Sequence, residues 1–158
     1  LDSIFMQNYT NYRIIYINDA STDETYEKVL ASIDKYDQGP RCTVINNPYR
    51  LASALGNICA ALSLCNDHEI ALILDADDWL AHENVLARIN QAYDDPNVWM
   101  TYGQFMVLPY GLTGWAQDVP DEIIKNNSIR SYHWSTTHLR TFYVWLFKHV
   151  APDSLKMD

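Results

Sequence analysis

Cysteine is scarce in this chain, and its three cysteines, Cys42, Cys59 and Cys65, include no C-x-x-C pair. Each lies in an apolar stretch, which is typical of small core residues in a reducing compartment and argues against disulfides and cysteine-bound metal. No segment approaches the roughly 18 apolar residues of a membrane span, and no signal peptide is recognisable. We therefore expect a cytoplasmic protein, with peripheral membrane contact only through parts outside this chain.

Basic residues are also few, since 11 Lys and Arg stand against 20 Asp and Glu, giving a net charge of −9. They are scattered along the chain, which argues against a nucleic-acid partner bound through its backbone. An acidic protein can still bind a phosphate ester if a divalent metal supplies positive charge. The 158 residues suffice for one domain with a core. Because the chain lacks an initiator Met and opens inside an amphipathic segment, we expect a fragment.

The most informative stretch is an apolar run, residues 70–74, that leads directly into Asp75, Asp77 and Asp78. Such a run suits a strand buried on both faces of a parallel sheet, and open α/β sheets hold ligands beyond the carboxyl ends of their strands. Carboxylates about 4 Å apart repel by roughly 4 kcal/mol at an effective dielectric near 20, so the cluster needs a cation or open water. Oxygen ligands favour Mg²⁺, Mn²⁺ or Ca²⁺ over zinc.

A simpler interpretation stays open, in which these carboxylates form a solvated loop and Asp78 only caps the next helix. An EF-hand is excluded by spacing, because Trp79 and Leu80 occupy the positions that need an oxygen ligand and a glycine.

Strand and helix patterns alternate along the first two-thirds of the chain. Strands are predicted at 13–17, 42–45, 70–74 and 98–108 from their β-branched and aromatic content. Helices are predicted from a capping box at Ser21 and Glu24, over 51–65, and over 85–93. This order predicts an α/β fold, with a Rossmann-like, mostly parallel sheet flanked by helices.

The last third is less regular. Residues 109–120 hold two Pro and two Gly and predict an ordered loop over the sheet edge, and residues 121–127 a short helix. The spacing of Leu139, Phe142, Leu146 and Val150 predicts an amphipathic helix from His138 onward. Tryptophans are expected in the core or at its edge, with sugar stacking as the alternative for the first of them; they are Trp79, Trp99, Trp115, Trp134 and Trp145.

Two acidic turns, Asn18-Asp19 and residues 75–78, each follow a predicted parallel strand, so both should open on one edge of the sheet, with room for a nucleotide between them. The chain has neither G-x-x-x-x-G-K-[ST] nor G-x-G-x-x-G. Phosphate binding would therefore have to use a metal.

Three motifs in register carry a family resemblance. Residues 16–25, Tyr-Ile-Asn-Asp-Ala-Ser-Thr-Asp-Glu-Thr, resemble the V-D-D-G-S-T-D-G-T signature of glycosyltransferase family 2, and residues 74–80 resemble its D-x-D loop. Between them, Asn47 and residues 51–57 are similar to the family's N-x-G-x-x-x-A-R-N helix start. The match covers roughly residues 1–108.

The resemblance implies a GT-A fold and inverting, metal-dependent transfer from a nucleotide-diphospho sugar with Mn²⁺ or Mg²⁺. By position, Asp19 would contact the base, usually uracil. Asp75 would contact the ribose or donor sugar and share the metal with Asp77. Further candidates for contacts with the nucleotide are Asn18, Ser21, Asn57 and Arg50. Asp78 is a further candidate in the acidic loop. His138 and Arg140 are candidates near the phosphates, because their segment is similar to H-L-R in some bacterial and viral members.

The chain departs from the family pattern in places. Asn18 stands where the family's first Asp is usual, and Gly56 where an Arg is frequent, so a second contact to the nucleotide is either missing or supplied by Arg50. The family's first strand should precede Leu1. The catalytic base is expected outside this chain, and the downstream acids are expected to be surface or capping residues; these are Asp118, Asp121, Glu122 and Asp158.

We therefore expect a donor-binding α/β core at 1–108 and, in the same domain, the start of an acceptor-side region at 109–158. The expected function is transfer of a sugar from a UDP sugar to a hydroxyl of a saccharide, lipid or protein acceptor, and this fragment alone is expected to bind donor more firmly than it turns over. Two alternatives stay open: a nucleotidyltransferase of similar fold and a noncatalytic binding or assembly module.

Overall fold

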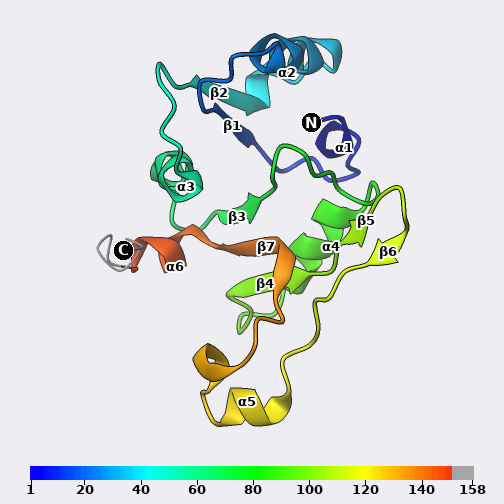
Figure 1. Cartoon of the computed structure of the whole chain (residues 1–158), viewed down its shortest axis with the longest axis vertical. Helices are drawn as coiled ribbons and strands as arrows, with labels where there is room; N and C mark the ends of the chain where they lie inside the picture. Colours follow the sequence, from blue (N-terminus) through cyan, green and yellow to red (C-terminus); the bar gives the residue numbers. More distant parts are fainter. Residues whose placement is uncertain (151–158) are drawn as a thin grey trace.

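The computed structural model describes residues 1–150, whose strands form three small sheets with helices around them (Figure 1). The α/β class is therefore confirmed, whereas the prediction of one mostly parallel sheet is wrong. Within residues 1–150, only β1 and β2 pair in parallel, and the other strand pairs are antiparallel. The physical reason is that a strand from the last part of the described sequence lies between two of the predicted strands.

The parallel pair forms the first part of the fold. Strands β1 (Ile14–Asn18) and β2 (Cys42–Asn46) run in register, so that Asn18 and Asn46 end side by side. The connection contains α2 (Thr25–Lys35), which buries Val29 and Ile33, and a short 3-10 turn at Gly39–Arg41. A short helix, α1 (Asp2–Phe5), precedes β1. These elements match the predicted strand, helix and strand.

Two predicted helix starts are shifted. The capping box at Ser21 and Glu24 is wrong, because α2 begins at Thr25, whose amide donates to the Asp23 carboxylate at 3.0 Å. Helix α3 (Ala54–Ser63) begins after Ser53, whose hydroxyl accepts a hydrogen bond from the Gly56 amide at 3.0 Å. Helix α3 thus begins where a short polar side chain satisfies a free amide, three residues after the start predicted from apolar spacing.

The second part is an antiparallel sheet with the order β3, β7, β4. Strand β3 (Ile70–Ile73) follows α3, and β4 (Met100–Gly103) follows α4 (Val85–Ala92), both as predicted in place and type. Between them lies β7 (Thr137–Tyr143), where the sequence predicted a helix. That prediction is wrong for residues 138–143, and a helix, α6 (Val144–Lys148), forms only afterwards.

The reason for the extended conformation of β7 is tertiary. Its apolar residues fit a helical spacing, but Thr137, Thr141 and Phe142 also favour strands, and both edges of β7 find hydrogen-bonding partners in β3 and β4. Thr141 is fully buried, and its hydroxyl contacts the Tyr93 hydroxyl at 2.8 Å and the Thr101 hydroxyl at 2.6 Å. A helix would leave these buried groups unpaired.

The segment after β4 is less compact. The predicted strand 98–108 breaks into β4 and β5 (Met106–Val107), and the predicted loop contains β6 (Leu112–Thr113), which pairs with β5 as a hairpin. Helix α5 (Asp121–Lys125) and a 3-10 turn (Ile129–Ser131) complete the arm at the bottom of Figure 1. None of the helices in residues 1–150 has the length and apolar character to cross a membrane.

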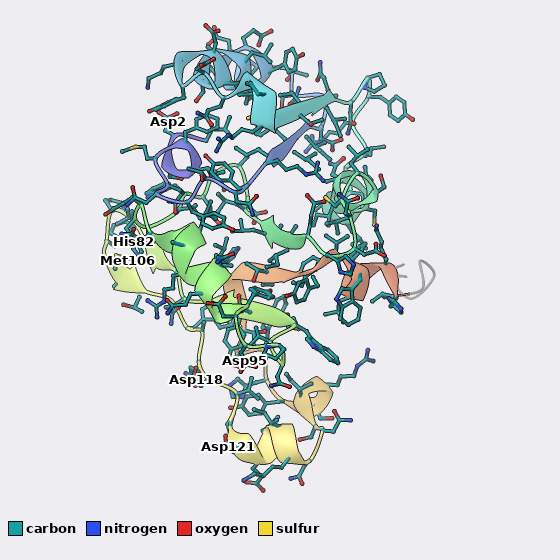
Figure 2. All side chains as sticks on the ribbon, turned by 180° about the vertical axis from the view of Figure 1, so that it is seen from behind. Asp2, His82, Asp95, Met106, Asp118 and Asp121 are labelled. Carbon is teal, nitrogen blue, oxygen red and sulfur yellow. The ribbon has the colours of Figure 1, made fainter. Side chains whose placement is uncertain are left out.

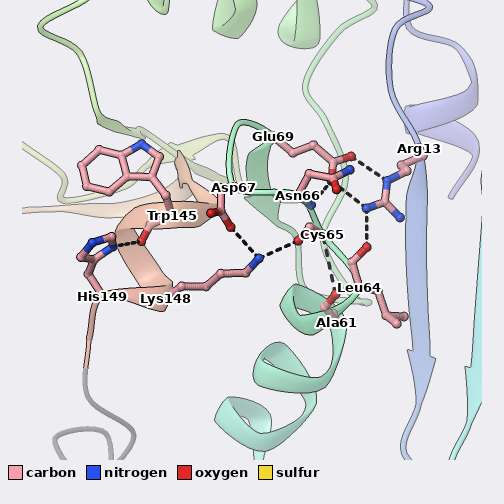
Figure 3. A network of polar contacts seen from close by, with 10 residues as sticks. All are labelled: Arg13, Ala61, Leu64, Cys65, Asn66, Asp67, Glu69, Trp145, Lys148 and His149. Carbon is pink, nitrogen blue, oxygen red and sulfur yellow. Dashed lines mark hydrogen bonds and ion pairs between the residues drawn. The ribbon is translucent and has the colours of Figure 1, made fainter.

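A polar network joins the two parts of the fold (Figure 3). The Arg13 guanidinium, next to β1, donates to both carboxylate oxygens of Glu69 at 2.7 and 2.8 Å and to the Leu64 carbonyl at 2.9 Å. The Lys148 ammonium in α6 contacts Asp67 at 2.7 Å and the Cys65 carbonyl at 2.8 Å. The turn between α3 and β3 is thus held from both sides.

Candidate metal centre

Two carboxylates and an imidazole converge where β3 ends. Asp75 and Asp78 lie in the turn after β3, which is closed by a hydrogen bond from the Asp78 amide to the Asp75 carbonyl at 3.1 Å. His138, near the start of β7, places its Nε2 atom 3.6 Å from Asp75 Oδ2 and 3.8 Å from Asp78 Oδ2. One ligand atom from each of the three residues lies within 4.8 Å of the others.

The His138 ring is held from two sides. Its Nδ1 atom is hydrogen-bonded to the Thr137 hydroxyl at 2.9 Å, and the Phe105 ring packs edge-on against it with centroids 5.8 Å apart. Gly103 in β4 lets the backbone of β7 come close, because a Cβ atom there would lie 2.9 Å from the Leu139 amide nitrogen and 3.1 Å from the His138 carbonyl oxygen. The Nε2 atom is therefore directed to the two carboxylates.

This donor set fits a hard divalent cation. Ligand atoms around an octahedral Mg²⁺ or Mn²⁺, with bonds of about 2.1 Å, lie about 3 Å apart, so small side-chain rotations would close the group. Carboxylates suit Mg²⁺ and Mn²⁺, and one imidazole beside them favours Mn²⁺. The turn is solvent-exposed, so an ion could retain water and accept phosphate oxygens.

The group differs from the predicted metal pair. Asp77 is exposed and does not belong to it, whereas Asp78 and His138 do. The predicted metal role of Asp77 stays a prediction. The D-x-D spacing singles out Asp75 and Asp77 as the metal pair. The tight turn instead places Asp75 and Asp78 side by side. His138 is 63 residues from Asp75, and its place depends on the β3–β7 pairing, in which Ile73 lies opposite Arg140.

The first acidic turn has a different environment. The Asp19 carboxylate accepts hydrogen bonds from the Asn47 side-chain amide at 2.8 Å, the Leu51 amide at 2.9 Å and the Ala52 amide at 3.1 Å. The hydrogen bond from the Leu51 amide has the largest part in lowering the pKa of Asp19, and the one from the Asn47 side chain has the next largest. Ala20 and Ala52 have φ angles of 54° and 51°, a region that alanine seldom adopts. Asp19 thus organises the loop after β2.

The other predicted nucleotide residues surround this loop. Asn18 is only 3% exposed, its amide donates to the Asn46 side chain at 2.8 Å, and its oxygen accepts from the Ser21 amide at 3.3 Å. Asn57 accepts a hydrogen bond from Asn47 at 3.0 Å. Arg50 and Arg140 are exposed and form no ion pair within residues 1–150. The structure therefore brings Asn18, Asp19 and Asn57 together and leaves both arginines in solvent.

The acidic residues farther along the chain lie away from both turns. Asp121 and Glu122 form the first turn of α5, and Asp118 lies on the segment that leads into it (Figure 2). Asp158 is outside the described residues. Asp118 also lines an open depression of about 510 Å³ beside β4, which contains none of the residues of the two acidic turns.

No curated protein sequence matches the chain. The family profile described as Glycosyl transferase family 2 matches residues 1–151, which is nearly the whole sequence and includes both acidic turns, the loop 47–52 and the strand that bears His138. A match of this extent shows that the chain belongs to glycosyl transferase family 2.

Proposed function

We propose that this chain binds the nucleotide-diphospho sugar donor, a UDP sugar, for a metal-dependent and inverting glycosyltransferase. Membership of the family implies a glycosyltransferase that uses a nucleotide sugar and an acceptor. The observation that carries the proposal is the convergence of Asp75, Asp78 and His138 at the end of β3. This is the edge where an α/β fold holds its ligands.

Asp75, Asp78 and His138 would hold a Mn²⁺ or Mg²⁺ ion. When bound, the ion neutralises the charge that develops on the leaving nucleotide diphosphate. The free oxygen of Asp75 would orient the ribose or donor sugar. Within residues 1–150, His138 alone is within ion-pair distance of the carboxylates of this turn, so the diphosphate would need the cation to approach.

Asp19 would contact the base while it holds the loop after β2. A carboxylate offers about four acceptor sites. Two hydrogen bonds reach Oδ1 and one reaches Oδ2, so Oδ2 can accept one more from a base N–H group. The low pKa of Asp19, caused first by the Leu51 amide, keeps this group ionised and a good acceptor. The rest of the pocket would come from Asn18, Ser21, Asn57 and Arg50.

Isothermal titration of UDP with and without Mn²⁺ tests this function. We expect binding that requires Mn²⁺ in the wild-type chain. The variant D78N should lose this dependence, with a fall in affinity of at least tenfold. D77N is the matched control, because it removes one charge from the same turn without removing a member of the converging group.

The outcomes separate the possible errors. If D77N loses binding and D78N retains it, the metal is held by the pair predicted from sequence and the geometric group is not the site. If UDP does not bind the wild-type chain with Mn²⁺, the proposed donor function of this chain is wrong.

A further inference from the structure

A chain of aromatic rings leads from the metal group to the surface. Phe105 packs edge-on against His138, Trp115 packs edge-on against Phe105 with centroids 6.3 Å apart, and Trp134 follows at 6.4 Å from Trp115. Trp115 is 51% exposed and Trp134 69% exposed. Two tryptophans that were expected in the core or at its edge thus present much of their surface to solvent. Counted from the His138 ring, Trp115 is the second ring along this chain and Trp134 is the third.

These rings are held in place by the backbone around them. The Gln117 amide donates to the Ser135 carbonyl at 2.9 Å, which joins the two segments that carry the tryptophans. The Trp134 indole N–H donates to the Thr136 carbonyl. The Gly114 amide donates to the Phe105 carbonyl at 2.7 Å, and a Cβ atom at Gly114 would overlap the Phe105 ring. The surface is therefore formed before any ligand arrives.

Polar groups lie next to this surface in the depression beside β4. Its lining includes Gln117 and Asp118, which are exposed and whose side chains form no hydrogen bond within residues 1–150. The lining contains no Lys or Arg. Aromatic faces attract the weakly positive C–H edges of sugar rings, while amide and carboxylate groups bind sugar hydroxyls. Since the lining of the depression carries an acidic residue and no basic one, it would repel an anionic headgroup or acidic peptide.

We propose that Trp115 and Trp134 form a stacking surface for a neutral saccharide acceptor, whose hydroxyls are bound by Gln117 and Asp118. This inference rests on the proposed function, because it takes the metal group as the place of transfer. It selects a saccharide from the three acceptor classes that the sequence left open. It also gives Asp118 a role in binding the acceptor.

The test uses the full chain labelled with ¹⁵N at its tryptophan indoles, in the presence of UDP and the diamagnetic ion Mg²⁺. Cellotriose and chitotriose serve as neutral probes. We expect saturable shifts of the Trp115 and Trp134 indole signals with at least one trisaccharide. The variants W115A and W134A should each weaken this binding at least tenfold. The matched control is W99A, since Trp99 is 53% exposed but packs on Trp145, toward the opposite end of β7 from His138.

Calorimetry of UDP with Mn²⁺ on the same samples separates this inference from the donor function. If UDP binds and neither trisaccharide shifts the two indoles, the saccharide surface is wrong and the donor function stands. If a trisaccharide binds but UDP does not, the proposed role of the tryptophan surface as an acceptor site is wrong. If phosphatidylcholine vesicles broaden the two indole signals and the trisaccharides do not shift them, the surface contacts lipid instead, and the proposal is overturned.

Discussion

The turns after β1 and β3 are both acidic, but their carboxylates have opposite environments. Asp19 accepts three hydrogen bonds from its own chain, whereas Asp75 and Asp78 face each other and the His138 ring. A carboxylate that the chain itself satisfies organises local structure. The side chains of Asp75 and Asp78 accept no hydrogen bond within residues 1–150, which leaves them free to bind a cation that relieves their mutual repulsion.

The largest expected effect contrasts the two turns directly. H138A removes a ligand of the metal group and should weaken Mn²⁺ binding by about 100-fold, or roughly 2.7 kcal/mol. N47A removes a partner of Asp19 and should leave Mn²⁺ affinity within about twofold. Electron paramagnetic resonance of free Mn²⁺ measures both. Equal losses in the two variants would mean that the turns do not differ as proposed.

The second prediction concerns Gly103, which brings β4 and β7 together beside His138. G103A should destabilise the fold by about 1–3 kcal/mol, since the new methyl group meets backbone atoms that cannot rotate away. It should also weaken Mn²⁺ binding, because the shift of β7 moves His138. Chemical denaturation and the Mn²⁺ assay measure these effects. G111A is the control, as a Cβ atom there meets no other group, although its φ of 65° adds some strain. Unchanged Mn²⁺ affinity in a destabilised G103A would show that the strand contact does not position the ring.

The third prediction is a pH dependence in the network that joins the two parts. The Arg13 hydrogen bonds lower the pKa of Glu69 from 4.5 to about 2. A carboxyl group whose pKa is lower in the folded state stabilises the fold above its unfolded pKa, and this contribution is lost as pH falls from about 4.5 toward 2. Because the two side chains are 37% and 34% exposed, solvent screening limits the contribution to about 1 kcal/mol.

Denaturation curves at pH 6 and pH 3 measure this contribution in the wild type and in E69Q. The variant should lose less stability than the wild type on acidification, because it cannot be protonated at this position. An identical loss in both proteins would mean that the ion pair contributes nothing to folding.

The smallest expected effect is local to the first turn. D19N keeps one oxygen acceptor but loses the charge, so the amides of Leu51 and Ala52 should exchange faster with solvent while β1 stays protected. Hydrogen exchange measured by NMR resolves these amides. D77N is the control, since Asp77 forms no hydrogen bond with this loop. Faster exchange throughout β1 and β2 would show that Asp19 supports the whole parallel pair.

Local chemistry made part of this site predictable. The strand before Asp75, the strand before Asp19 and the acidic residues themselves follow from β-branched runs that end in polar residues. The partners of these residues did not follow. Asp78 replaces Asp77 in the converging group because the turn folds back, as the hydrogen bond from Asp78 to Asp75 records. No spacing rule based on alternation anticipates such a turn.

The sequence by itself determined the parallel pair, the positions of most helices, and a family membership that three motifs in register indicated. Only the tertiary structure determined that residues 137–143 form a strand. Their apolar spacing suits a helix, but their backbone hydrogen bonds are made with β3 and β4. The pairing of β7 with β3 and β4 places His138 in the metal group and Trp134, just before β7, next to Trp115. Strand pairing between distant segments is a property of the whole chain, because each partner supplies hydrogen bonds that a local pattern cannot contain.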